Sequence, residues 1–153
     1  KHQTPQRAAG ISPSAPVKLL DASFESCGDL QELFQPLSPD LVALQLSTGL
    51  LKGRVQVWGF DGFRLNLLTT NQSLFLSGAR RAEPCTLAIP LDPSKCDGAY
   101  QAQGISMPWP GLMGYNRGLI DFDLKVPAGA RLATVVINRR PGSVAMGEQT
   151  GHD

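Results

Sequence analysis

The chain has 153 residues, of which 42% are hydrophobic and 18% are charged, and its formal net charge is +1. This length predicts one domain that buries a single apolar core without help from metals or disulfides. A domain that binds nucleic-acid phosphates usually has an excess of basic residues. A membrane-spanning helix needs about 18 consecutive apolar residues. The sequence has neither feature, so we expect no direct contact with nucleic acid and no membrane span.

The two ends of the chain are rich in residues that favour flexible structure. Three prolines, a glycine and several Ser and Gln residues lie in the first 16 positions, and "PGSVAMGEQTGHD" closes the sequence. This composition predicts a flexible arm over residues 1–20 and a flexible tail or linker over 141–153. The folded domain should then span residues 21–140.

Cysteine and histidine are sparse. Cys27, Cys85 and Cys96 have no close C-x-x-C spacing, which is typical of free thiols in a reducing compartment, so we expect a cytoplasmic protein. His2 and His152 lie at the extreme ends. The body of the chain cannot supply histidine for a metal site or for a Ser-His-Asp triad, and we expect no metal or other cofactor.

The clearest helical pattern covers Ser26–Phe34. Ser26 and Asp29 resemble a capping box, while Leu30 and Leu33 fall on one face. The prolines that follow should end this helix.

The rest of the sequence is typical of a β protein, because short β-prone runs alternate with Gly, Pro, Asp and Asn. These runs predict a mainly β sandwich or barrel with one or two short helices. The expected strands are Leu41–Thr48, Gly53–Phe60, Phe63–Thr70, Leu74–Gly78, Cys85–Leu91, Tyr100–Ser106, Leu112–Tyr115, Ile120–Val126 and Arg131–Asn138.

Asp61-Gly62 predicts a hairpin with a two-residue type I′ turn, which needs positive φ at both residues. The expected partners are Phe60 with Phe63, Trp58 with Leu65, Gln56 with Leu67, and Arg54 with Thr69. All eight side chains share one face because the strand period is two. That face is rich in aromatic and leucine area, so we expect it to point inward. The opposite face carries Val55, Val57, Arg64, Asn66 and Leu68.

The inward stripe suggests a binding site. Trp58, Phe60, Phe63 and Leu65 would form its apolar lining, and Gln56 and Arg54 would orient a polar end of the ligand. The alternative is that the aromatics only fill a core and that Arg54 extends from the edge into water.

A second apolar segment, Ile105–Gly118, contains Trp109 and Tyr115 beside two methionines. These side chains could line the mouth of the barrel, serve a dimer interface, or contribute to the core. Asp121 and Asp123 alternate with apolar residues, which favours a solvated outer face over paired acid–base catalysis.

The order of these features resembles the N-terminal sensing and dimerisation domain of AraC-type transcriptional regulators. The pieces that carry the resemblance are Leu37-Ser38-Pro39, Gly53, Asn71–Leu74, Pro90-Leu91 and Pro127-Ala128-Gly129. The resemblance covers most of the body of the chain, from Phe24 to Asn138.

The resemblance implies a cupin-like double-stranded β-helix, a jelly-roll barrel, that binds an effector or dimerises. The implied partners are a small apolar or amphipathic effector and a second copy in a homodimer. DNA would be bound only through a C-terminal domain absent from this chain, and the chain itself would not be an enzyme. Two alternatives remain open: a purely structural oligomerisation module, and a small metal-independent cupin-fold enzyme. In the enzyme, Tyr100, Tyr115, Asp121 and Asp123 would supply acid–base groups.

Overall fold

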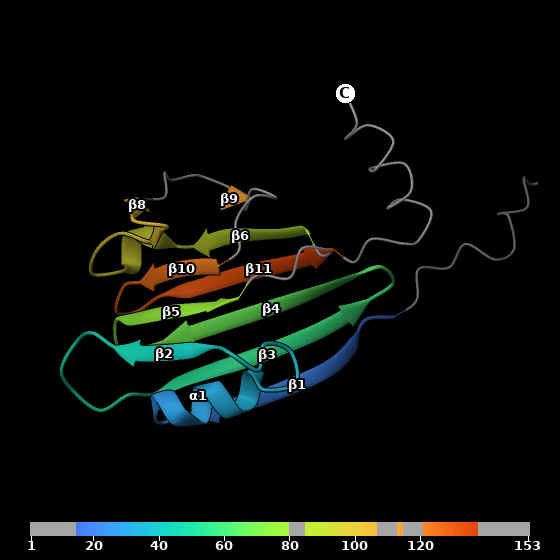
Figure 1. The fold of residues 1–153 in the computed structure, drawn as a ribbon, viewed down its shortest axis with the longest axis horizontal. Coiled ribbons are helices and arrows are strands. Elements are labelled where there is room, and N and C mark those ends of the chain that lie inside the picture. Colours follow the sequence, from blue (N-terminus) through green and yellow to red (C-terminus); the bar gives the residue numbers. More distant parts are fainter. Residues whose placement is uncertain (1–14, 80–84, 107–112, 115–120, 138–153) are drawn as a thin grey trace, which may run out of the picture.

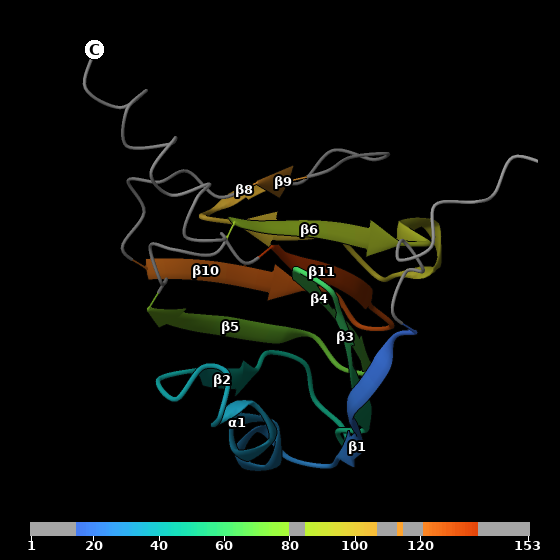
Figure 2. The same ribbon diagram turned by 90° about the vertical axis from the view of Figure 1, so that its right-hand side faces the viewer.

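The computed structural model describes residues 15–79, 85–106, 113–114 and 121–137 (Figure 1). The described part is mainly β, as the sequence predicts, with two antiparallel sheets that face each other (Figure 2). Its one α-helix, α1 (Cys27–Phe34), lies beside β1 and β2 at one edge of the two layers (Figure 2).

The first sheet has six strands. Their order is β1 (Val17–Phe24), β3 (Gly53–Phe60), β4 (Phe63–Thr70), β11 (Arg131–Ile137), β6 (Cys85–Leu91) and β9 (Met113–Gly114).

The second sheet has five strands. Their order is β2 (Val42–Gln45), β5 (Leu74–Ala79), β10 (Asp121–Val126), β7 (Gln101–Ala102) and β8 (Ile105–Ser106). A short 3-10 helix, η1 (Pro93–Lys95), follows β6.

From β4 onward the chain passes repeatedly between the two sheets. β4, β6, β9 and β11 belong to the six-stranded sheet, whereas β5, β7, β8 and β10 belong to the five-stranded sheet. The two layers are therefore tied together by their connections, and the core forms between their facing sides.

Most of the expected elements are confirmed. Gly53–Phe60, Phe63–Thr70 and Cys85–Leu91 have the predicted bounds, and Ser26 caps α1 by accepting a hydrogen bond from the Asp29 N–H at 3.0 Å. The expected strand Tyr100–Ser106 is instead two strands, since Gln103 and Gly104 both adopt positive φ between β7 and β8.

Strand β1 was not predicted. It begins at Val17, within the segment 1–20 that was expected to be a flexible arm, and it pairs with β3 along its length. Residues 1–14 of that arm and the tail 141–153 lie outside the described residues. The run "VKLLDASF" lacks clean alternation because β1 is an edge strand, with most of its side chains exposed.

The β3–β4 hairpin has the predicted register, with Phe60 opposite Phe63 and Arg54 opposite Thr69. The predicted turn type is wrong: Gly62 has a φ of 86°, but Asp61 is not among the described residues with positive φ. Positive φ at the second central residue alone fits a type II turn. Gly62 therefore supplies the left-handed backbone without help from Asp61.

The predicted inward face of this hairpin is also wrong. Val55 and Val57 are fully buried, while Arg54 on the opposite face is exposed. Val55 and Val57 join the same core as Phe24 and Leu74, so the face that meets the second sheet is the β-branched one. The aromatic stripe therefore lies on the outer surface of the six-stranded sheet.

One end of the sandwich is densely packed. The Phe24 ring lies over Gly53, where any Cβ atom would collide with it. Leu74 and Val126, opposite each other in the five-stranded sheet, are fully buried nearby in the same core. We call this region, near the start of β3 and the end of β4, the packed end.

Candidate ligand-binding cavity

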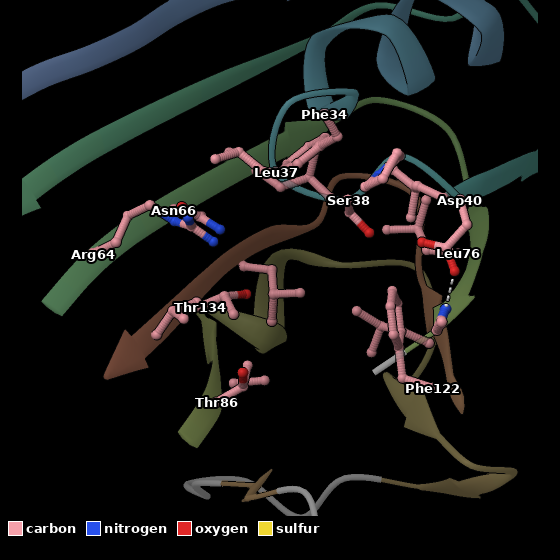
Figure 3. A pocket seen from close by; sticks show the side chains of 18 residues that line it. Phe34, Leu37, Ser38, Asp40, Arg64, Asn66, Leu76, Thr86, Phe122 and Thr134 are labelled. Atoms are coloured by element: carbon pink, nitrogen blue, oxygen red, sulfur yellow. Dashed lines mark hydrogen bonds between the residues drawn. The ribbon is translucent and has the colours of Figure 1, made fainter. Parts of the chain in front are cut away.

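A cavity of about 520 Å³ lies between the sheets, toward the other end of the sandwich (Figure 3). Its walls come from β4, β6 and β11 on one side, from β5 and β10 on the other, and from the segment that follows α1. The residues that line it are Phe34, Leu37, Ser38, Pro39, Asp40, Leu41, Arg64, Asn66, Leu68, Leu76, Ala79, Thr86, Ala88, Phe122, Leu124, Leu132, Thr134 and Val136.

The segment after α1 forms one rim of the cavity. The helix ends at Phe34, whose carbonyl accepts hydrogen bonds from the N–H groups of Leu37 (2.9 Å) and Ser38 (2.6 Å). Further along, the Asp40 carboxylate accepts the Ala79 N–H at 2.7 Å and so ties the rim to the end of β5. Local backbone bonds and this cross-link hold Phe34 and Leu37 against the cavity.

Of the two sheet walls, the one from the six-stranded sheet carries the polar side chains, among the apolar residues Leu68, Ala88, Leu132 and Val136. Asn66 lies opposite Thr134, and Arg64 and Thr86 both lie opposite Val136 in the adjacent row. Arg64 Nε donates a hydrogen bond to Asn66 Oδ1 at 3.2 Å, and the guanidinium points toward the cavity (Figure 3). These side chains project from three neighbouring strands, which gives them a rigid support.

The wall formed by the five-stranded sheet is apolar. Leu76 and Leu124 lie opposite each other on β5 and β10, and Phe122 covers Gly78 two residues earlier on β10. Phe34 and Leu37 extend this apolar surface from the rim (Figure 3).

The volume and lining suit a small molecule. Ligand pockets commonly enclose about 300–1,000 Å³, with mostly apolar walls and a few placed polar groups. Among the described residues that line the cavity, Arg64 and Asp40 are the charged ones, and they lie on different sides of it (Figure 3). The site can therefore contact the apolar part of a ligand with one surface and its polar group with another.

The residues predicted to bind a ligand do not line this cavity. Trp109 and Tyr115 lie outside the described residues, and the other six are on the outer side of the β3–β4 hairpin. They are Arg54, Gln56, Trp58, Phe60, Phe63 and Leu65.

Several of these outer residues have contacts of their own. Arg54 donates two hydrogen bonds of 2.7 Å to the Asp21 carboxylate, and this pairing holds the pKa of Asp21 well below its usual range. The Phe60 and Phe63 rings stack at 4.5 Å beside the turn. Lys18 Nζ lies 5.0 Å from the Trp58 ring. These aromatics cover the outer surface of the sheet.

The sequence interpretation missed Arg64 and Asn66 because it placed them on the solvated face. The signal that could have identified them was their shared face with Val55 and Val57, two β-branched residues whose shape suits an inter-sheet core. A polar residue on an otherwise buried face says more about a binding site than an exposed aromatic residue does.

The acid–base candidates do not meet in the described part of the structure. Tyr100 is buried, with its hydroxyl donating to the Arg131 carbonyl and accepting the Arg131 N–H, both at 3.0 Å. Asp121 and Asp123 are exposed, which confirms the expected outer face of β10. Tyr115 lies outside the described residues.

Cys27 and Cys96 are free, partly buried thiols, and burial raises the pKa of Cys27. The raised pKa disfavours the reactive thiolate of Cys27, while the side chain of Cys85 lies outside the described part.

No helix in residues 15–79, 85–106, 113–114 and 121–137 has the length and apolar character needed to cross a membrane. Comparison with protein-family models, curated proteins and solved structures found no match to this chain. Function therefore has to be inferred from the geometry of the cavity.

Proposed function

We propose that this chain is an effector-sensing domain that binds a small amphipathic molecule between its two sheets. The observation that carries this proposal is the cavity of about 520 Å³, whose mostly apolar lining includes a group of polar side chains on the six-stranded sheet. Core packing alone would favour closing such a space, because empty volume forfeits contacts between side chains.

The strand order supports a jelly roll of the cupin type. An eight-stranded jelly roll folds two Greek keys into two sheets. Strands β4 to β11 match this arrangement, with β4-β11-β6-β9 in one sheet and β5-β10-β7-β8 in the other. Strands β1, β2 and β3 would then be additions at the edges of a sensory barrel.

The regulator assignment rests on the order of the sequence motifs. The Leu37-Ser38-Pro39 motif lies on the rim of the cavity, and Pro127-Ala128-Gly129 forms the turn that leads into β11. We propose a cytoplasmic AraC-type regulator whose DNA contacts come from another domain. Sequencing of the gene beyond the codon for Asp153 tests this. Two helix-turn-helix modules are expected there, and a stop codon would contradict the assignment.

A homodimer is part of the same proposal. Val17, Phe63 and Ile137 leave exposed apolar area on the six-stranded sheet, which is compatible with association. Sedimentation equilibrium should give twice the chain mass, whereas a monomer at all concentrations would contradict it.

Thermal-shift measurements test the binding proposal. The probes are octanoate, 4-phenylbutyrate and their alcohols, octan-1-ol and 4-phenylbutan-1-ol. A molecule that binds only the folded chain raises the melting temperature by mass action. Ala88→Leu adds bulk inside the cavity and should abolish the shift, while Ala99→Leu, at an exposed position that does not line the cavity, should retain it.

Thr86→Leu provides a second way to fill the space, at a partly exposed position near the start of β6 where the folding risk is lower. If none of the four probes shifts the native chain, the binding proposal is wrong. If both filled variants keep the full shift, binding occurs elsewhere and the cavity assignment fails.

A further inference from the structure

The outer face of the six-stranded sheet is apolar across four neighbouring strands, β3, β4, β11 and β6. Alternate residues share this face because the strand period is two, and the register sets them in rows that cross the sheet. One row consists of Trp58, Leu65, Val135 and Leu87. The next row consists of Gln56, Leu67, Ala133 and Ile89. All of these residues except Ala133 are partly exposed.

The outer face of the other sheet differs at its centre. Asp121, Asp123 and Lys125 are exposed on the outer side of β10, where water can solvate them. The two rows on the six-stranded sheet have no charged member. A contiguous apolar face on a soluble protein marks a surface that another apolar surface covers.

A second copy of the same face can cover it. Two identical faces pack against each other about a twofold axis between them, in the way that facing sheets pack in a sandwich. If this axis runs across the strands, between the two rows, each row meets the other row of the partner. Leu65 then lies against the partner's Leu67. Val135 lies against the partner's Ala133, so that a large side chain meets a small one.

The charged residues of the edge strand β1 fit the same axis. Lys18 is paired with Trp58 and Asp21 with Gln56, and both charged side chains lie on the outer face, where they contact Trp58 and Arg54. The axis that pairs the apolar rows therefore sets Lys18 against the partner's Asp21, and Asp21 against the partner's Lys18. An axis along the strands, at the centre of the sheet, would set β1 against β9 and lose this match.

The arginines of this face are also compatible with the axis across the strands. Arg54 and Arg131 lie in the row after Gln56, whereas Phe60 and Ile137 lie in the row before Trp58. Arg54 therefore meets the partner's Phe60, and Arg131 meets the partner's Ile137. The long arginine stems can pack on these apolar side chains, and the arginines of one copy do not face those of the other.

We propose that two copies of this chain associate through the outer faces of their six-stranded sheets, about a twofold axis that crosses the strands between Trp58 and Gln56. This inference rests on the proposed homodimer and adds its interface. The aromatic stripe of the β3–β4 hairpin, which the sequence predicted to bind a ligand, would then contact the second copy.

Exchanging the charges on β1 tests the axis. Lys18→Asp and Asp21→Lys each set like charges against one another in a homodimer, so each should raise the dimer Kd about tenfold at low salt. In an equimolar mixture of the two variants, both contacts between positions 18 and 21 again join opposite charges. A heterodimer should form with a Kd within about threefold of the native value. Sedimentation equilibrium of each variant and of the mixture measures these constants.

Val135→Ser tests the apolar rows. It removes an apolar side chain from the centre of the face, and the Kd should rise about tenfold because that area is no longer buried favourably. The matched control is Val42→Ser, which removes an exposed valine from the five-stranded sheet and should leave the Kd within about twofold of the native value.

The outcomes separate this interface from the homodimer itself. If the native chain is a monomer at all concentrations, the homodimer proposal fails. If the native chain dimerises but the mixture of charge variants binds no tighter than each variant alone, the interface assignment is overturned and the homodimer stands. The same holds if Val135→Ser keeps the native Kd, or if Val42→Ser weakens the dimer as much as Val135→Ser does.

Discussion

The two ends of this sandwich use the same pair of sheets in opposite ways. At the packed end, the Phe24 ring fills the space over Gly53, and Leu74 and Val126 exclude water completely. At the cavity end, strands β4, β5, β10 and β11 line a hollow whose wall includes Arg64.

This difference suggests that one end of the sandwich mainly stabilises the fold, whereas the other end provides the candidate binding site. The packed end contains complementary apolar shapes, so it should supply most of the free energy of folding. The cavity end keeps an arginine and an asparagine, hydrogen-bonded to each other, on the inner face of a core strand. Substitutions at the two ends should therefore differ in what they damage.

The largest expected effect is from Phe24→Ala at the packed end. Removing a fully buried phenylalanine leaves a void that its surroundings fill only in part, and the free energy of unfolding should fall by about 3–5 kcal/mol. Phe122→Ala at the cavity end should cost less, because this ring is partly exposed and borders space that is already empty. Urea unfolding of the three proteins measures both differences.

Phe122→Ala should also weaken binding of 4-phenylbutyrate, whereas Phe24→Ala should leave the affinity of the remaining folded protein unchanged. Equal losses of stability at the two positions would remove the distinction between the ends.

Tyr100→Phe should have an intermediate effect and extend the comparison to polar packing. The substitution leaves the Arg131 N–H and carbonyl without the hydroxyl that joins them, and a buried unsatisfied group costs about 1–3 kcal/mol. Burial, with a contribution from Cys96, raises the pKa of Tyr100, so the hydroxyl stays protonated across the ordinary pH range.

The Tyr100→Phe loss should therefore be the same at pH 6 and pH 9, as measured by urea unfolding at each pH. A loss that changes strongly with pH would show that the tyrosine hydroxyl ionises in this range.

The β3–β4 hairpin shows what the sequence could predict. Its turn position and register follow from Asp61-Gly62 and the period of two, since both are local properties. The inward face depends instead on which side meets the second sheet, a contact between distant segments. The aromatic and leucine area of the Trp58 face predicts that this face points inward. In the structure Val55 and Val57 on the opposite face are in the core, and Lys18 lies over the Trp58 ring on the outer surface.

The cavity was harder to predict for the same reason. Its lining joins the rim at Phe34 and Ser38 to Thr86 and Thr134, which are far apart in the chain. No local pattern marks such a set. The motif Leu37-Ser38-Pro39 enters the sequence interpretation only through the resemblance, and in the structure it lies on the rim.

The smallest expected effect is from Asp21→Asn, on the outer surface away from the cavity. Arg54 first, and then Lys18, lower the pKa of Asp21 through hydrogen bonds. A carboxyl group whose pKa is lower in the folded state stabilises the fold above its unfolded pKa of about 4, and this stabilisation is lost as the pH falls through the folded value.

Asp21→Asn should therefore unfold at a slightly lower urea concentration than the native chain at pH 7, and the gap should close progressively below about pH 4. The pair is partly exposed, so high salt should narrow the gap at pH 7 as well. Asp123→Asn, an exposed carboxylate on the five-stranded sheet, is the control that should show no such gap. Octanoate affinity should be unchanged in both variants, because neither residue lines the cavity. A gap at pH 2 as large as the gap at pH 7 would contradict the ion-pair explanation. A loss of octanoate binding in Asp21→Asn would contradict the separation between the outer surface of the hairpin and the cavity behind it.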